Sequence, residues 1–394
     1  MADAPDRAFP VPPEVAEIAE TLEAAGHETW AVGGVLRDWL LGEPWGELDL
    51  ATAAPPETVR RLFPRTVPVG LKHGTVGVLD RRRRLHEVTT FRRDVETDGR
   101  HAVVSFGVSL EEDLARRDFT INAIAYHIRT GRWADPFGGQ EDLKRGLIRA
   151  VGDPTARFRE DYLRILRALR FATRYGFEID PATWNAMQQA ARGLDRLSAE
   201  RVRDEWFKGL RGAQSLVRYG RLWREAGAAA VWLPELRDPY PGTDRPPSPR
   251  DPVILTVVAC EAPARVLLRL RASGQEIERA QVMDAAAPAP EGTTPVQVRG
   301  WLREVGAAAD DLHLLAAARE GVAPAWAPAV AQVRRRGEAT SRNQLALKGE
   351  DLIALGVAPG PGLGALLDRL LDAVIDDPSL NTRGRLSDLV AQWR

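Results

Sequence analysis

The stretches VGGVLRD at residues 32–38 and GEPWGELDLAT at residues 42–52 decide how the first part of this sequence folds. Apolar residues before the two glycines predict a strand over residues 28–32, and the pattern after them predicts a short helix over 37–41. The apolar run that follows predicts a second strand over 48–52. A strand, a glycine turn, a helix and another strand indicate a domain that combines helices with a sheet.

The glycine turn is a candidate phosphate site. Gly33 and Gly34 lack the side chains that would keep a phosphate away from the backbone, and free N–H groups at a helix start attract anions. Arg37 adds a guanidinium that can bind phosphate at two points. An ordinary strand-to-helix turn with Arg37 on the surface accounts for the same residues, so the glycine pair alone does not decide between the two.

Three carboxylates are candidate catalytic groups. Glu47 and Asp49 are two positions apart in a β-like run, so both side chains point to one face of the strand. Two carboxylates on one face suit Mg²⁺, which takes oxygen ligands and bridges substrate phosphates. Glu87, on the predicted strand LHEVTTF, is a candidate third carboxylate. The alternative for these residues is the solvated face of a strand.

Length and composition restrict the function classes. A chain of 394 residues is expected to form about two to four compact units. The net charge of −1 means that a nucleic acid must be held by local basic patches. The single Cys260 excludes an internal disulfide and a cysteine-based zinc cluster, which favours a cytoplasmic location. With no long apolar run and no leader at the start, we expect no membrane association.

The order of the predicted elements divides the chain. Helices and short strands are mixed up to about residue 140, and the pattern is helical from there on. Two long periodic segments, residues 160–177 and 198–212, begin with acidic or Ser-x-Glu caps. Segments rich in proline at 237–252 and 287–295 are predicted to be loops between helical parts.

A charged segment lies within the otherwise apolar, helix-like run ARRDFTINAIAYH at residues 115–127. Buried charges are costly unless they are paired or bind a ligand. Arg116, Arg117, Asp118 and Asn122 are therefore candidates for contacting a ribose 2′-hydroxyl. A helix cap with surface ion pairs is the alternative.

The segment EDYLRILRALR carries the most specific chemistry. Asp161, Arg164, Arg167 and Arg170 recur every three residues, which groups them along one side of a helix. A carboxylate only accepts hydrogen bonds and a guanidinium only donates them. Cytosine and adenine both present an amine beside a ring-nitrogen acceptor, so both match Asp161 and Arg164, whereas guanine and uracil do not. The alternative is a solvated basic face.

In this order and spacing, the segments resemble the class II tRNA nucleotidyltransferases, which comprise the CCA-adding enzymes and the bacterial poly(A) polymerases. The resemblance covers about residues 30–212 through the motifs GGxxRD, ExDLAT, EVTTFRRD, DLARRDFTINA, DPFGGQEDL, EDYLRILRALRF and SAERVRDE. A stretch at residues 347–383 is similar to the C-terminal tail of the CCA-adding branch. Several independent motifs agree, so the resemblance is highly specific.

The resemblance implies an α+β fold with a polymerase-β-like nucleotidyltransferase head followed by an all-α neck, body and tail. We expect the catalytic head over residues 1–140, the base-reading neck over 141–212, the body over 213–325 and a tRNA-binding tail over 326–394. It assigns Glu47 and Asp49 to Mg²⁺, with Glu87 beside them as a catalytic carboxylate. The residues expected to bind the nucleotide are Gly33, Gly34, Arg37, Arg116, Arg117, Asp118, Asn122, Asp161, Arg164, Arg167 and Arg170.

The implied activity is template-independent addition of C and A nucleotides to the 3′ end of tRNA from CTP and ATP, with release of pyrophosphate. No protein partner is implied. A poly(A) polymerase is less favoured because this chain ends at Arg394 without a basic run. A specialised CC-adding or A-adding enzyme is a further alternative, although the loop expected at residues 92–106 is not shortened. A relative that binds RNA without catalysis is the competing class.

One position departs from the family pattern. The usual first metal ligand is Asp, and this chain has Glu47. The extra methylene extends the reach of the carboxylate, and Mg²⁺ requires near-octahedral geometry at roughly 2.0–2.1 Å. A longer side chain meets that geometry if its backbone lies slightly further back, so we expect an active enzyme.

Overall fold

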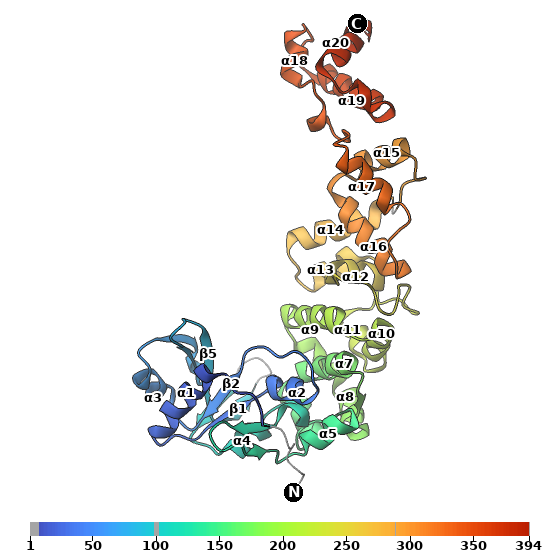
Figure 1. The fold of residues 1–394 in the computed structure, drawn as a ribbon. Helices are drawn as coiled ribbons and strands as arrows, with labels where there is room; N and C mark the ends of the chain where they lie inside the picture. The colour runs from blue at the N-terminus through green and yellow to red at the C-terminus, as the bar shows by residue number, and fades with distance from the viewer. Residues whose placement is uncertain (1–7, 98–101, 288, 394) are drawn as a thin grey trace. The chain divides into compact units, whose positions relative to one another are not determined.

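The structure is a computed structural model that describes residues 8–97, 102–287 and 289–393. The chain forms two compact units, Met1–Pro234 and Glu235–Arg394, which Figure 1 shows as a ribbon. The first unit combines a sheet with helices, and the elements described in the second unit are helical. The expected α+β class, with strands early in the chain and helices after them, is confirmed.

A mixed seven-stranded sheet with the order β3-β4-β5-β2-β1-β8-β9 forms the centre of the first unit. Only the β2–β5 pair is parallel. Its strands are β1 (Thr29–Val32), β2 (Asp49–Thr52), β3 (Thr66–Gly70), β4 (Thr75–Leu79), β5 (Leu85–Thr90), β8 (Ala125–His127) and β9 (Trp133–Ala134). All four residues of β1 are buried, which fits its central position.

Four short helices accompany the sheet, namely α1 (Pro13–Ala24), α2 (Gly34–Leu40), α3 (Pro56–Leu62) and α4 (Leu110–Ala115). Helix α1 buries the apolar face that its sequence predicts, with Val15, Ile18 and Leu22 turned inward. A separate hairpin of β6 (Arg92–Thr97) and β7 (Ala102–Phe106) follows β5. Part of the loop expected at 92–106, residues 98–101, lies outside the described residues.

The remaining helices of the first unit are α5 (Gly139–Arg145), α6 (Pro154–Glu160), α7 (Leu163–Tyr175), α8 (Pro181–Ala190), α9 (Ala199–Gly212), α10 (Leu216–Glu225) and α11 (Ala228–Trp232). Helices α7 and α9 pack against each other through apolar faces. Trp206, Tyr219 and Trp223 fill the interior between α9 and α10, with ring centroids 5.1–6.0 Å apart. This packing holds α7 rigidly, and α7 carries the arginines of the predicted site.

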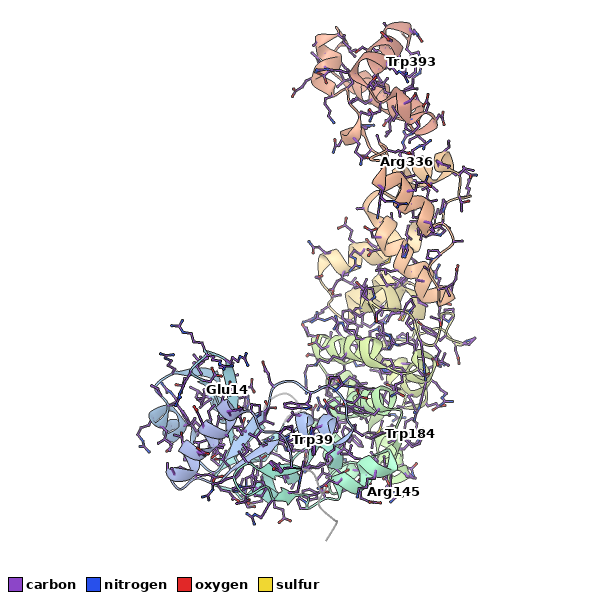
Figure 2. The ribbon with its side chains drawn as sticks, viewed as in Figure 1. Glu14, Trp39, Arg145, Trp184, Arg336 and Trp393 are labelled. Carbon is purple, nitrogen blue, oxygen red and sulfur yellow. The ribbon has the colours of Figure 1, made fainter. Side chains whose placement is uncertain are left out.

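The second unit contains α12 (Pro252–Ala259), α13 (Pro263–Arg269), α14 (Gly274–Ala285), α15 (Pro295–Val305), α16 (Ala309–Glu320), α17 (Ala327–Arg335), α18 (Gly349–Ala354), α19 (Pro361–Asp376) and α20 (Arg383–Trp393). The loops predicted at 237–252 and 287–295 contain no helix or strand over the described residues 237–251, 287 and 289–294, and residue 288 lies outside the described residues. Leu352, Leu370, Val374 and Leu386 belong to the apolar core of the last three helices. Trp393, labelled in Figure 2, lies under the guanidinium of Arg369, 4.0 Å from ring centroid to Cζ.

One expectation about local structure was wrong, and the start of another segment lies later than expected. The periodic segment 160–177 is helical as α7 (Leu163–Tyr175), which begins three residues later because the backbone is extended at Asp161 (φ −153°, ψ 106°), whose Oδ1 accepts the N–H of Leu163. Residues 115–127 are not a helix, since α4 ends at Ala115 and the chain continues through a 3₁₀ turn, η2 (Thr120–Asn122), into β8. The carboxylate of Asp118 accepts the next N–H, which competes with helix formation.

The part expected to be entirely helical also contains a small sheet. Strands β10 (Leu147–Ile148) and β11 (Glu178–Ile179) pair in parallel beside α7. Each strand has only two residues, too few for a periodic pattern in the sequence. Among the described residues, no helix has both the length and the apolar character needed to cross a membrane.

Gly209 tests the packing that holds α7 and α9. A Cβ at this position would lie 2.1 Å from Tyr219 Cζ, and Tyr219 is fully buried. Gly209→Ala is expected to lower the free energy of unfolding by about 1–3 kcal/mol through overpacking. Gly220→Ala on α10 is the matched control, because its Cβ would have 3.7 Å to the nearest atom and should raise stability by up to about 1 kcal/mol. Equal thermal midpoints for the two variants would contradict this account.

Candidate active site

The glycine turn faces a carboxylate and a guanidinium. Gly33 has φ +89°, which favours glycine, and it follows β1 directly. A Cβ there would lie 3.6 Å from Arg117 Nη1 and 3.7 Å from Asp49 Oδ2. The antiparallel pairing of Val32 with Asp49 produces this approach. The turn therefore brings the buried Gly33 and the half-buried Gly34 next to one positive and one negative group.

The candidate carboxylates meet at one end of β2. Asp49 is the first residue of β2, and the parallel register Leu50–Val88 brings it beside Glu87 on β5. Glu47 lies before the strand begins, so it is not fixed by strand pairing as the alternation suggested. Asp49 and Glu47 are both exposed, and Glu87 is half-buried. The edge formed by these residues is therefore acidic and open to solvent.

The surroundings of Asp49 make its ionisation costly. Burial of one side of the carboxyl by protein raises its pKa to about 6, with the charge of Glu87 and then of Glu47 acting in the same direction. The charge of Arg117 opposes this rise. The other side of Asp49 remains open to solvent, so a cation can approach it.

These carboxylates fit a hard divalent cation in chemistry. A cation beside Asp49 would relieve the repulsion that raises its pKa, and Mg²⁺ is commonly held by one or two carboxylates together with substrate phosphates. Within the described ranges, no three Asp, Glu, His or Cys side chains are gathered around a single point. The carboxylates that could hold a metal here are Glu47 and Asp49, and the remaining oxygens would have to come from water and substrate.

Arg37 lies in the interior. It is 5 % exposed, and its guanidinium donates to Asp38 Oδ1 and to Asn122 Oδ1. Its Cζ lies 4.9 Å from the ring centroid of Phe171 and 5.0 Å from that of Tyr175 on α7. Arg37 therefore joins α2 to α7, and its contact with a phosphate would have to share the guanidinium with these partners.

Asp113 holds the adjacent arginines. The buried carboxylate of Asp113 accepts from Arg116 Nε at 3.0 Å and from Arg117 Nη2 at 3.4 Å. It also accepts the backbone N–H of Arg92, at the base of the β6–β7 hairpin, at 3.3 Å. Burial lowers the pKa of Arg117, while Asp113 raises it. The sequence analysis missed Asp113, although the acidic residue three and four positions before the arginine pair indicated it.

Asp118 and Asn122, which are buried, form one network with the half-buried Arg167. Asp118 Oδ1 accepts from Asn122 Nδ2 at 2.8 Å, and Oδ2 accepts from Arg167 Nε at 2.7 Å. Burial raises the pKa of Asp118, but the charge of Arg167 and the hydrogen bonds outweigh it and keep the pKa below its usual value. The network joins the segment after α4 to α7.

Asp161 and Arg164 flank the break between α6 and α7. Asp161 Oδ2 accepts from Arg201 Nη2 on α9 at 2.7 Å. Arg164 donates to Glu160, to the carbonyl of Arg157 and to the carbonyl of Arg116. The two side chains are thus held by protein partners, and Arg201 is a further residue that the sequence analysis missed.

Arg170 is separate from the open site. It is 8 % exposed and donates Nε to Glu205 Oε2 on α9 at 2.6 Å, with Cζ 4.1 Å from the ring centroid of Phe171. Only Arg164 and Arg167 of the three arginines predicted on α7 contact the segment 116–118. The three-residue spacing of the sequence therefore did not predict that the arginines have different partners.

Comparison with known proteins gives a consistent family. Residues 29–149 match the model described as Poly A polymerase head domain, and residues 176–238 match that described as probable RNA and SrmB-binding site of polymerase A. The chain is 36 % identical to the CCA-adding enzyme of Geobacillus stearothermophilus over 392 residues, which is 95 % of each chain. Identity to the CCA-adding enzyme of Anoxybacillus flavithermus is 48 % over 197 residues, about half of each chain.

The structure is also similar to a solved one. The CCA-adding enzyme of Bacillus stearothermophilus in complex with CTP has a TM-score of 0.80 and 33 % identity, with 97 % of this chain and 98 % of that chain covered. A polymerase-β-like head followed by helical regions is thus confirmed as the fold.

The raised pKa of Asp49 gives a pH-dependent prediction. A carboxyl whose pKa rises from 3.8 to about 6 on folding stabilises the protein below about pH 4, and this contribution is lost as the pH rises through about 6. Mg²⁺ competes with the proton. At about ten times its Kd, Mg²⁺ should raise the thermal midpoint by a few degrees at about pH 7.5 and much less at about pH 5.

Asp49→Asn is the control for this measurement. It removes both the titrating carboxyl and a metal ligand, so its midpoint should not respond to Mg²⁺ at either pH and should exceed that of the wild type at neutral pH without Mg²⁺. The same Mg²⁺ response in Asp49→Asn as in the wild type would show that the cation binds elsewhere.

Proposed function

The chain belongs to the family of CCA-adding enzymes, and we propose that it adds C and A nucleotides to the 3′ end of tRNA from CTP and ATP, without a nucleic acid template. The observation that carries this proposal is the acidic end of β2 at Asp49, which lies beside the Gly33 turn and Arg117. A cytoplasmic location is part of the proposal, supported by the buried free thiol of Cys260.

Divalent metal use is general in this family, and we propose Mg²⁺ held by Glu47 and Asp49. When bound, Mg²⁺ supplies charge that makes the RNA 3′-hydroxyl more acidic and stabilises the departing pyrophosphate. Oxygen donors and an unfavourable concentration of negative charge at Asp49 support this assignment. Glu87 adds negative charge beside Asp49 and is proposed to help position the cation.

We propose that residues of this chain hold the triphosphate so that its α-phosphorus faces the attacking 3′-oxygen. We propose that the phosphates lie against the half-buried Gly34, where the Arg37 guanidinium is 3.0 Å from the position of a Cβ, with Arg117 providing a second positive charge beside Gly33. In the reaction the 3′-oxygen of the RNA forms a bond to the α-phosphorus while the bond from the α-phosphorus to the β-phosphate oxygen breaks. We propose a positioning role for four further residues, which support the groups that contact the triphosphate: Arg37, Arg116, Asp118 and Asn122. Their side chains form hydrogen bonds with one another or with neighbouring protein groups.

Base selection is proposed for Asp161 and Arg164. Each carboxylate oxygen of Asp161 accepts one hydrogen bond and has a second lone pair. Arg164 uses three of its five N–H donors, and within the described part of the chain Nε–H and one Nη2–H have no partner. An acceptor and a donor therefore remain, which match the amine and ring nitrogen of cytosine or adenine. Arg167 and Arg170 are proposed to support α7 in this role.

We also propose four functional parts: head, neck, body and tail over residues 1–140, 141–212, 213–325 and 326–394. The sheet and glycine turn support the catalytic role of the first, and Asp161 and Arg164 support base reading by the second. Helices α12 to α20 are proposed to bind the remainder of the tRNA. The compact units, which divide after Pro234, group the first helices of the proposed body with the head and neck.

The wild-type chain is expected to be active with glutamate at position 47. Incubation with tRNA that lacks its terminal nucleotides, with CTP alone, ATP alone or both, should give products whose sequenced 3′ ends read CCA only with both. Asp49→Ala should lower incorporation about a thousandfold or more, because a metal ligand is lost. Uninterrupted A tails would instead identify a poly(A) polymerase, and a wild type that is inactive until Glu47→Asp is introduced would contradict our interpretation.

Asp161→Ala tests base selection. Loss of the acceptor should relax or abolish the choice among the four nucleotides while the Kd for tRNA stays within about twofold. Asp204→Ala on α9 is the matched control, since it removes an exposed carboxylate from the same helical region. The measurement is single-turnover incorporation of each nucleotide, and an unchanged preference for C and A in Asp161→Ala would exclude the proposed role.

A further inference from the structure

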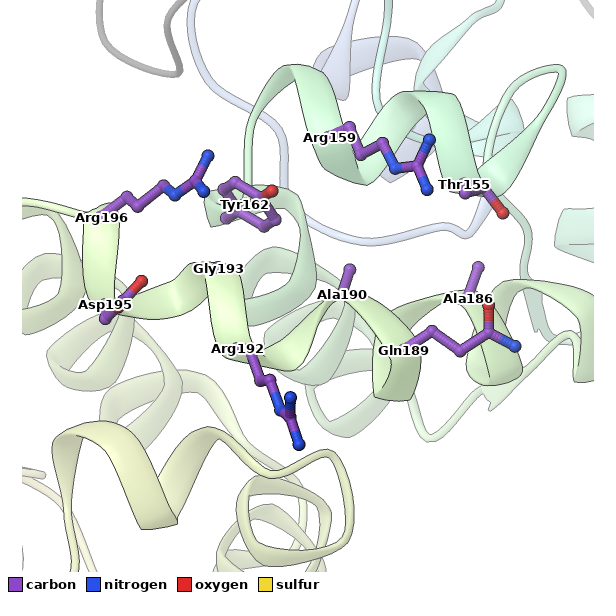
Figure 3. A pocket seen from close by; sticks show the side chains of 10 residues that line it. All are labelled: Thr155, Arg159, Tyr162, Ala186, Gln189, Ala190, Arg192, Gly193, Asp195 and Arg196. Carbon is purple, nitrogen blue, oxygen red and sulfur yellow. The ribbon is translucent and has the colours of Figure 1, made fainter.

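A second pocket in the first unit shares no residue with the site around Asp49. It lies between α6, α8 and a 3₁₀ segment, η3 (Ala191–Arg196), and has a volume of about 360 Å³. Figure 3 shows Arg159 and Thr155 on one side, Gln189 below them, and Tyr162 with Arg196 at the other end. Its lining is mostly polar, and it contains more arginines than carboxylates.

An aromatic ring forms one wall of this pocket. A Cβ on Gly193 would lie 2.0 Å from Tyr162 Cε1, so the ring packs directly on the backbone of η3 and requires glycine there. The guanidinium carbon of Arg196 lies 5.7 Å from the ring centroid of Tyr162. The ring is only partly buried. Its position is thus fixed by packing while one side stays accessible.

The arginines of the pocket are free of ion pairs with described carboxylates. Within the described residues, Arg159, Arg192 and Arg196 have no carboxylate at ion-pair distance, and all three are exposed. In Figure 3, Arg159 extends along the pocket and Arg196 toward Tyr162, whereas Arg192 points away from the ring. By contrast, the neighbouring arginines with carboxylate partners include Arg149, Arg157, Arg164, Arg167, Arg170, Arg201 and Arg218.

We propose that this pocket binds one nucleotide of the RNA substrate, upstream of the reacting 3′ end, with its base against Tyr162 and the phosphates on its two sides at Arg159 and Arg196. Arginine binds phosphate oxygens with paired N–H donors, and an aromatic ring stacks on any base. Thr155 and Gln189 add neutral hydrogen-bonding groups at the end of the pocket where Arg159 lies. A sequence-independent contact of this kind suits an enzyme that must accept many RNAs.

A free nucleotide and a nucleotide within RNA share this chemistry. RNA is favoured because residues 176–238, which include α8 and η3, match a family model described as a probable RNA-binding site. Tyr162 also directly follows Asp161 in the sequence. An RNA whose 3′ end reaches the base-reading residues therefore passes near the Tyr162 side of the pocket. The inference rests on the proposed function for the identity of the RNA, but the pocket itself is tested by binding and not by turnover.

The experiment measures binding of the full-length protein to labelled tRNA that lacks its terminal nucleotides, over a range of salt concentrations. Arg159→Ala with Arg196→Ala should weaken the Kd about tenfold and reduce the slope of log Kd against log salt concentration by about 2, because two phosphate contacts are lost. The Kd for CTP, measured separately, should not change. A loss of CTP binding with intact tRNA binding would overturn the assignment to RNA.

Arg60→Ala with Arg61→Ala is the matched control. These residues are exposed on α3, which does not line the pocket, and the change removes the same charge. The control should bind tRNA like the wild type. An equal effect in both double variants would show that net charge, and not the pocket, accounts for the loss, and no measurable tRNA binding by the wild type would also overturn the proposal.

The stacking contact is tested without a change of charge. Tyr162→Phe keeps the ring and should retain the wild-type Kd for tRNA, whereas Tyr162→Ala should weaken it about tenfold. Gly193→Ala places a methyl where the ring lies and should act like Tyr162→Ala. Thermal midpoints near that of the wild type confirm that the variants are folded. Wild-type affinity in both Tyr162→Ala and Gly193→Ala would exclude the base contact.

Discussion

The salt bridge between Asp118 and Arg167 is the interaction on which the arrangement of the site depends. It joins the segment that follows α4 to the helix that carries the base-reading residues, with 2.7 Å between Arg167 Nε and Asp118 Oδ2. Asp118 is 9 % exposed, so removal of Arg167 would leave a buried carboxylate without its cationic partner, whereas the Arg167 side chain is itself about one third open to solvent. The lowered pKa of Asp118 means that the contribution of this pair to stability is present at neutral pH and is lost on acidification.

Around this pair, each charged group has more than one partner. Asn122 donates to Asp118 and accepts from Arg37, and Arg37 lies against Phe171 and Tyr175 of α7. The sheet and α7 are therefore joined by a connected network. A network of this kind fixes the distance between the phosphate end and the base end of a nucleotide site, which a polymerase without a template requires because protein groups must replace the pairing base.

The sequence predicted the secondary-structure elements and candidate residues of this site better than the contacts that each side chain makes. Apolar patterns located β1, β2 and β5, because each strand has a pattern of its own length. They could not place the break at Asp161 or the end of α4 at Ala115, since both depend on side chains that bond to the backbone. Likewise, the equal spacing of Arg164, Arg167 and Arg170 conceals that one lies beside Glu160, one beside Asp118 and one beside Glu205.

The glutamate at position 47 is easier to understand once its backbone is located. Glu47 precedes β2, and the β1–β2 register begins at Asp49. The main chain of Glu47 is therefore not held in position by strand pairing. The segment is anchored two residues earlier, where the ring of Trp45 lies 5.3 Å from that of Phe9. An irregular segment with an aromatic anchor can lie further back than a strand, and a side chain longer by one methylene then restores the reach of the carboxylate. We therefore expect the longer side chain of Glu47 to offset the absence of strand pairing at this residue.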